Sequence, residues 1–90
     1  MMVLPYLVEL LSTFLLVLVV LASGGNALMI GATLALLILL AGKVSGAHIN
    51  PAISLAMLLQ GSMTAMEFIS YVTSQMAGGA AAYYAYRAVM

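Results

Sequence analysis

The sequence has no cysteine and very little charge. The absence of Cys in all 90 residues excludes disulfides and thiolate metal sites within the chain. Charged residues make up only 4%, whereas 67% of the residues are hydrophobic and the mean hydropathy is +1.27. A soluble domain carries several times more charge. The composition predicts an integral, multi-pass membrane protein and leaves open which membrane holds it.

Other absences remove whole classes of function. The formal net charge is zero and there is no basic stretch, so a nucleic-acid partner is not expected. The chain has a single His and no nucleophile-base pair, so neither a metal site, nor another cofactor site, nor a catalytic site is expected. No Lys or Arg precedes the first apolar run, which is too long for a secretory signal. That run is interpreted as a retained membrane span.

Three apolar stretches are long enough to cross a bilayer, which takes about 20 residues. They cover residues 4–22, 27–43 and 64–87, and together they leave room for one membrane unit over residues 1–90. A Ser-Gly-Gly-Asn turn at 23–26 separates the first two. The third ends in tyrosines and an Arg, which suit a membrane interface. The fold class predicted is all-α.

A shorter apolar helix lies between the second and third stretches. Residues 50–60, "NPAISLAMLLQ", span only about 16 Å as a helix, roughly half a bilayer. Asn50 is a strong N-cap, Pro51 suits the first helical position, and Gly61 ends the pattern. Irregular backbone at 44–49 precedes the helix. Such a segment is typical of a re-entrant loop, tolerated in a membrane only against protein or a wet cavity.

The residue types of this segment suit a neutral, hydroxyl-bearing solute. An Asn that caps a helix through its side-chain oxygen keeps two amide hydrogens free as donors. The carbonyls of residues 46–49 cannot take part in a regular helix and are available as acceptors. The alternative is that Asn50-Pro51 is an ordinary turn before an ordinary helix.

Three motifs favour the first interpretation. "SGAHINPA" at 45–52 resembles the first signature loop of the major intrinsic proteins, the aquaporins and glycerol facilitators. "ELLSTF" at 9–14 and "YVTSQMAGG" at 71–79 resemble the first- and third-helix patterns of that family. The resemblance implies half of an aquaporin-like inverted-repeat bundle, with three transmembrane helices and one re-entrant half-helix. It implies a passive channel for water or small neutral solutes such as glycerol.

The same resemblance assigns roles to particular residues. The signature Asn, Pro and Ala correspond to Asn50, Pro51 and Ala52, and the carbonyls that face the pore to Gly46, Ala47 and His48. In the family, two such loops enter from opposite faces and meet at their helix N-termini. This chain has one such loop.

Glu9 is costly inside a membrane span and therefore needs partners. Taken alone, it suits a proton-coupling carboxylate in a small dual-topology transporter. The resemblance implies that Glu9 instead supports the re-entrant loop, with His48 as a neighbour. His48 itself is expected to be a satisfied buried histidine rather than a gate. Gln75 is expected to tie two helices together, and contact with the loop stays open.

The sequence also departs from the family pattern. Ile30 lies 20 residues before Asn50, where many water-selective members have an aromatic, and Ile53 follows Ala52. There is no second Asn-Pro-Ala, so water and glycerol selectivity both stay open. The missing half is expected in the rest of a longer protein, of which this chain is a fragment. Alternatives are an antiparallel copy, since Lys43 and Arg87 give no orientation bias, or a non-conducting module on a larger partner.

Small residues recur at every fourth position in two places, at 27, 31 and 35 and at 74, 78 and 82. Such stripes allow helices to approach closely in lipid. They are interpreted as helix packing within the bundle or an oligomer.

Overall fold

The computed structural model describes residues 3–90, in which all regular structure is helical. Four helices follow one another, as the composition predicts for an all-α protein: α1 (Leu4–Ala22), α2 (Ala27–Ser45), α3 (Pro51–Leu59) and α4 (Ala65–Val89). The short α3 separates the two longer helices α2 and α4. The fold is therefore three long helices and one short one.

Three of the four helices begin at a residue whose side chain accepts a hydrogen bond from a first-turn N–H group. The side chain of Asn26 accepts from the Met29 N–H at 3.0 Å at the start of α2. Thr64 and Glu67 form a reciprocal capping box at the start of α4. Asn50 accepts from the Ala52 N–H at 2.8 Å at the start of α3. Side-chain caps therefore set these three helix starts.

Two helices end later than the sequence pattern indicates. α2 continues to Ser45 rather than 43, because the left-handed residue that terminates it is Gly46, with φ 86°, and not Gly42. α4 continues to Val89 rather than 87. Both extensions lengthen regular helix without changing the order of the elements.

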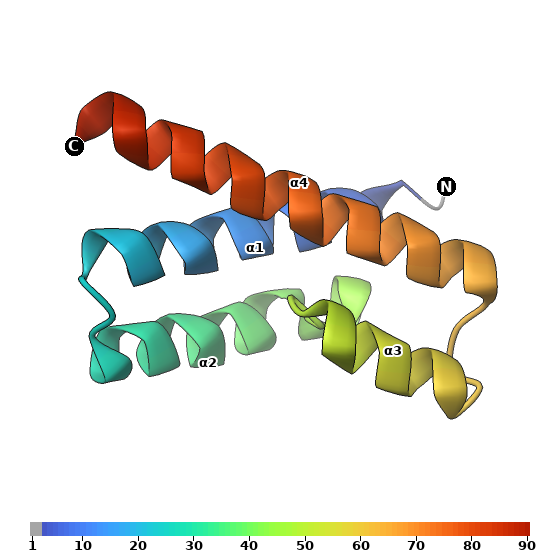
Figure 1. Cartoon of the computed structure of the whole chain (residues 1–90). Helices are drawn as coiled ribbons and strands as arrows, with labels where there is room; N and C mark the ends of the chain where they lie inside the picture. Colours follow the sequence, from blue (N-terminus) through green and yellow to red (C-terminus); the bar gives the residue numbers. More distant parts are fainter. Residues whose placement is uncertain (1–2) are drawn as a thin grey trace.

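The three long helices lie side by side, with α1 in contact with both α2 and α4. Figure 1 shows α1 and α4 running in the same direction and α2 running the opposite way. The short α3 starts near the middle of the molecule, packs against α4, and ends at the level where α4 begins. The whole chain is 39 × 24 × 22 Å in extent.

The contact between α1 and α4 depends on a glycine. A Cβ on Gly78 would overlap the carbonyl oxygen of Leu10 and lie 3.1 Å from the backbone N of Phe14. The second small-residue stripe therefore includes a point at which α1 and α4 approach each other closely. Gly31, in the first stripe, has no atom within 4 Å of such a Cβ. That stripe is exposed on α2 rather than packed within the chain.

Polar side chains occupy the interior and apolar ones cover much of the outside. The buried polar residues include Glu9 and Ser54 at 0% exposure, whereas Leu28 and Leu39 on α2 are 82% and 80% exposed. By length and composition, α1 and α2 could each cross a membrane. Only 17% of the apolar segment of α1 and 11% of that of α2 are buried inside the chain. α4, with 25 residues, is long enough to cross a membrane, but it is less apolar than α1 and α2 and is not identified as a span by composition.

Candidate functional site: the loop between α2 and α3

The carboxylate of Glu9 lies at the centre of the buried polar cluster. It accepts the N–H of Ile49 at 2.8 Å and the N–H of His48 at 3.0 Å, both from the loop. It also accepts the hydroxyl of Ser45 at 2.7 Å and the amide of Gln75 at 3.0 Å. Four donors thus converge on two oxygens. One side chain of α1 thereby joins the end of α2, the loop and α4.

The loop that Glu9 contacts has an unusual backbone. Ala47 has φ 49° and Ile49 has φ 58°, in the left-handed region that residues with a Cβ rarely adopt. A β-branched residue such as Ile is a particular outlier there. Conformations of this kind persist where surrounding bonds fix them. The carboxylate of Glu9 takes the N–H of Ile49 itself and that of the preceding His48, so it holds the strained turn in place.

A second group of bonds attaches α3 to the same cluster. Gln75 donates to the hydroxyl of Ser54 at 3.0 Å, and Ser54 is 2.8 Å from Nδ1 of His48. The hydroxyl of Ser54 therefore joins the amide of Gln75 to the ring of His48. The ring also packs on Tyr71, with centroids 4.8 Å apart. Tyr71 donates to the carbonyl of Ser45 at 2.6 Å.

The loop leaves a row of backbone oxygens without partners. Within residues 3–90, no group donates a hydrogen bond to the carbonyls of Gly46, Ala47 or His48. Beside them, Asn50 uses its side-chain oxygen to cap α3, and its amide nitrogen makes no hydrogen bond within the same residues. Free acceptors and free donors therefore lie next to each other at the start of α3.

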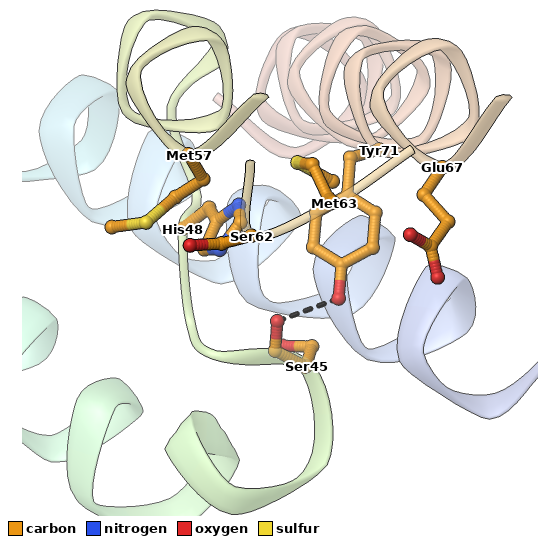
Figure 2. Close-up of a pocket in the computed structure, with 7 residues that line it drawn as sticks. All are labelled: Ser45, His48, Met57, Ser62, Met63, Glu67 and Tyr71. Carbon is orange, nitrogen blue, oxygen red and sulfur yellow. Dashed lines mark hydrogen bonds between the residues drawn. The ribbon is translucent and has the colours of Figure 1, made fainter. Parts of the chain in front are cut away.

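Two cavities flank this cluster. The smaller, of about 160 Å³, lies between the end of α2, the loop, α3 and the start of α4 (Figure 2), and Figure 2 shows the Tyr71 hydroxyl bonded to Ser45 at its edge. The larger, of about 340 Å³, lies between α1 and α4 and includes Ile49 and Pro51 from the loop and α3. The N-terminus of α3 therefore faces open volume on one side and a packed polar cluster on the other.

The residues predicted from the sequence as a site divide into two groups. Glu9, Gln75 and the loop from Gly46 to Asn50 come together, although Glu9 and Gln75 are 66 positions apart. Pro51 and Ala52 begin α3, as residues at a capped helix start do. Ile30 is half-buried near the start of α2 and makes no hydrogen-bonded link to this cluster.

Three polar residues of the cluster were not predicted: Ser45, Ser54 and Tyr71. Two of them carried a usable signal. Ser54 lies four positions after Asn50 in an apolar helix, and Tyr71 lies four positions before Gln75, so each shares a helix face with a predicted residue. Ser45 is the first residue of the motif at 45–52, but its bond to Glu9 could not be predicted, because that bond depends on where α2 ends.

The comparisons with known proteins agree with the motifs. The model of the family described as Major intrinsic protein matches residues 24–90. The chain is 43% identical to Aquaglyceroporin AqpS of Rhizobium meliloti over 61 residues, 68% of this chain and 26% of that protein. It is 47% identical to Aquaporin-8 of Rattus norvegicus over 49 residues, 54% of this chain and 19% of that protein.

A further relative extends over more of the chain. The Glycerol uptake facilitator protein-like 6 of Lactiplantibacillus plantarum is 37% identical over 81 residues, 81% of this chain and 38% of that protein. The chain thus spans about a fifth to two fifths of the length of these relatives. No solved structure matches it significantly. Because the family model covers well over half of its residues, the chain belongs to the major intrinsic protein family.

Proposed function

We propose that the chain forms half of a passive channel for water and small neutral solutes such as glycerol. The observation that carries the proposal is the row of three unbonded carbonyls, from Gly46 to His48, beside the free amide of Asn50. A hydroxyl group or a water molecule needs both an acceptor and a donor, and this arrangement offers both. Three relatives bear the names of an aquaglyceroporin, an aquaporin and a glycerol uptake facilitator.

The start of α3 also favours neutral solutes over cations. A helix N-terminus carries a partial positive charge, and the donors of Asn50 point to the same preference for an oxygen lone pair. The end of α3 near Gln60 lies far from the loop carbonyls. A cation at the loop would therefore meet an unfavourable field, whereas a neutral hydroxyl group would not.

In this proposal α1, α2 and α4 cross the membrane and α3 is the re-entrant half-helix. The longest dimension of the chain, 39 Å, exceeds the roughly 30 Å of a hydrocarbon core. α4 is less apolar than the other two because buried Tyr71 and Gln75 face the cluster inside the chain. These two polar side chains are thereby withdrawn from lipid, whereas Thr73 and Arg87 of the same helix are exposed.

A second half is required to enclose the pore. Unbonded carbonyls at membrane depth are tolerated only against protein or water, and the chain by itself covers one side of them. The four donors around Glu9 also bear on the alternative of a proton-coupled transporter. A carboxylate that holds two loop N–H groups is a structural support, and releasing it for proton transfer would free the strained loop.

The test joins this chain to the second half of the Rhizobium meliloti aquaglyceroporin and measures osmotic shrinkage of liposomes by light scattering. Asn50→Asp keeps the cap of α3 but removes the donors and adds charge. We expect water and glycerol flux to fall at least about fivefold, as for one lost hydrogen bond of roughly 1 kcal/mol. Because Ile30 is aliphatic, glycerol should permeate above background in the unmodified chimera.

The control is the intact aquaglyceroporin with the corresponding Asn replaced, which shows that the assay detects the loss. Circular dichroism establishes that the Asn50→Asp chimera is folded. A folded chimera whose flux does not change would refute the role of Asn50. A chimera that conducts water but excludes glycerol would refute the expectation that the aliphatic Ile30 leaves the pore open to glycerol.

A further inference from the structure

The three unbonded carbonyls of the loop belong to peptide units whose N–H groups are all bonded. The carbonyl of Gly46 shares its peptide unit with the N–H of Ala47. The next two units pair the carbonyl of Ala47 with the N–H of His48, and the carbonyl of His48 with the N–H of Ile49. All three units are trans, so each carbonyl points away from the N–H of its own unit. The group that accepts the N–H therefore sets the direction of the carbonyl.

Two different side chains accept these three N–H groups. The carboxylate of Glu9 accepts the last two, at 3.0 and 2.8 Å. The N–H of Ala47 instead donates to the hydroxyl of Ser45, at 3.1 Å. That hydroxyl donates in turn to Glu9 at 2.7 Å, and Ser45 is only 5% exposed. The direction of the Gly46 carbonyl therefore depends on the hydroxyl of Ser45.

The unit between Gly46 and Ala47 is also the one whose backbone favours turning over. Because the peptide bond is rigid, a turn of this unit changes only ψ of Gly46 and φ of Ala47. Ala47 has φ 49°, which is unfavourable for a residue with a Cβ, and the turn would bring this angle to the negative range. Gly46 has no Cβ and tolerates either orientation. The bond from Ala47 to Ser45 opposes the turn, because the turned N–H could not reach the hydroxyl.

We propose that Ser45 is a positioning residue for the passage of solute. Its hydroxyl holds the Gly46–Ala47 unit so that the row keeps its first acceptor. Without the hydroxyl, the unit turns over and an N–H donor replaces that acceptor. Glycerol is affected more than water, because its several hydroxyl groups use several acceptors of the row at once. This inference rests on the proposed function, since the row matters only where solute passes along it.

The experiment replaces Ser45 in the chimera described above and measures glycerol and water flux in the same liposomes. Ser45→Ala removes the hydroxyl but keeps the backbone carbonyl that accepts from Tyr71. We expect the ratio of glycerol flux to water flux to fall about twofold to tenfold, as for the loss of one neutral hydrogen bond. Ser45→Thr keeps a hydroxyl at the same position and should restore the ratio of the unmodified chimera.

The matched control is Ser54→Ala, the same substitution in the same polar cluster. Ser54 is 0% exposed and bonds the side chains of Gln75 and His48, but it accepts no N–H of the loop. Stability against dodecyl sulfate should fall to a similar extent in Ser45→Ala and Ser54→Ala, whereas the flux ratio should change only in Ser45→Ala. Equal changes of the ratio would mean that Ser45 acts only through the stability of the cluster, and would overturn the inference.

Solid-state nuclear magnetic resonance measures the orientation of the peptide unit directly. Labelling Gly carbonyls with carbon-13 and Ala amides with nitrogen-15 selects Gly–Ala pairs, and the helical pairs 31–32 and 79–80 serve as internal controls. We expect the signal of pair 46–47 to shift in Ser45→Ala and to stay in place in Ser54→Ala.

A further measurement needs no variant. In the unmodified chimera, the Ala47 N–H should exchange slowly with heavy water, because it points into the cluster. Rapid exchange, or an unshifted signal together with an unchanged flux ratio in folded Ser45→Ala, would overturn the inference. The loss of flux in Asn50→Asp does not depend on this peptide unit. It would still support the proposed function if Ser45 proves to have no role.

Discussion

The contact between α1 and α4 and the outer surface of α2 differ in almost every respect. α1 and α4 meet at Gly78, in a region where the carboxylate of Glu9 and the amide nitrogen of Gln75 are buried and hydrogen-bonded to each other. α2 packs on α1, meets α4 at the hydrogen bond between Ser45 and Tyr71, and exposes most of its leucines, Leu39 at 80%. The specific packing of the helices within the chain therefore depends on the buried polar residues.

The difference indicates that the α1–α4 contact is formed within the chain, whereas the outer surface of α2 is suited to contact lipid or another helix. In lipid, apolar surface gives no preference for one neighbour over another, so helix contacts depend on small residues and polar bonds. The α1–α4 region has both within the chain. The outer surface of α2 has a small-residue stripe without a partner and apolar side chains that lipid or another helix can cover.

The largest effect is expected from Glu9→Gln, which places an amide donor against four donors. The free energy of unfolding should fall by about 3–5 kcal/mol, as when one partner of a buried charged group is removed. The measurement is circular dichroism during titration with dodecyl sulfate in mixed micelles. The matched control is Glu67→Gln, which alters only the capping box of α4 and should cost less than about 1 kcal/mol. Equal losses of stability in Glu9→Gln and Glu67→Gln would show that the buried carboxylate contributes no more than the one in the helix cap.

A smaller effect is expected from Gly78→Ala, because the added methyl group overlaps the carbonyl of Leu10. Stability in the same titration should fall by about 1–3 kcal/mol. Gly31→Ala on α2 meets no atom within 4 Å and should stabilise its helix by about 0.5–1 kcal/mol. If both substitutions stabilise the protein, the close approach of α1 and α4 is not required.

The smallest effect compares two leucines on α2. Leu37 is 7% exposed and packs with Ala41, Ala47 and Ile49, so Leu37→Ala should cost about 1–2 kcal/mol. This is less than in a soluble core, because lipid removes the transfer term. Leu39→Ala should have almost no effect on the isolated chain. A loss at Leu39 only in concentrated liposomes would reveal a partner on the outer surface of α2.

The sequence predicted the helices well and the side-chain bonds incompletely. Caps at Asn26, Asn50 and Thr64 are local, so the starts of α2, α3 and α4 follow from neighbouring residues. The late end of α2 does not, because two nearby glycines are equally suitable and tertiary bonds to Ser45 choose between them. The left-handed conformation of Ile49 contradicts the preference of a β-branched residue, and the long-range bond from its N–H to Glu9 supports it.

The cluster around Glu9 has a similar division. Family motifs bring Glu9, Asn50 and Gln75 to attention, whereas the bond between Ser45 and Glu9 depends on the three-dimensional path of the chain. The sequence also could not predict that the side-chain oxygen of Gln75 lacks a hydrogen-bond partner among the described residues. An amide has two polar ends, and only the structure reveals that the nitrogen is used twice and the oxygen not at all.

The bonds of Glu9 also set an order of events during synthesis. Glu9 is made before the partners of its carboxylate, since His48 follows 39 positions later and Gln75 follows 66 positions later. The loop cannot keep its left-handed turn before α1 lies beside it, and the cluster cannot close before α4 arrives. α1 therefore serves as a template that enters first, and the loop takes its final form last. A ribosome-bound chain that stops before α4 should expose residues 46–49 to protease, and one that includes α4 should protect them.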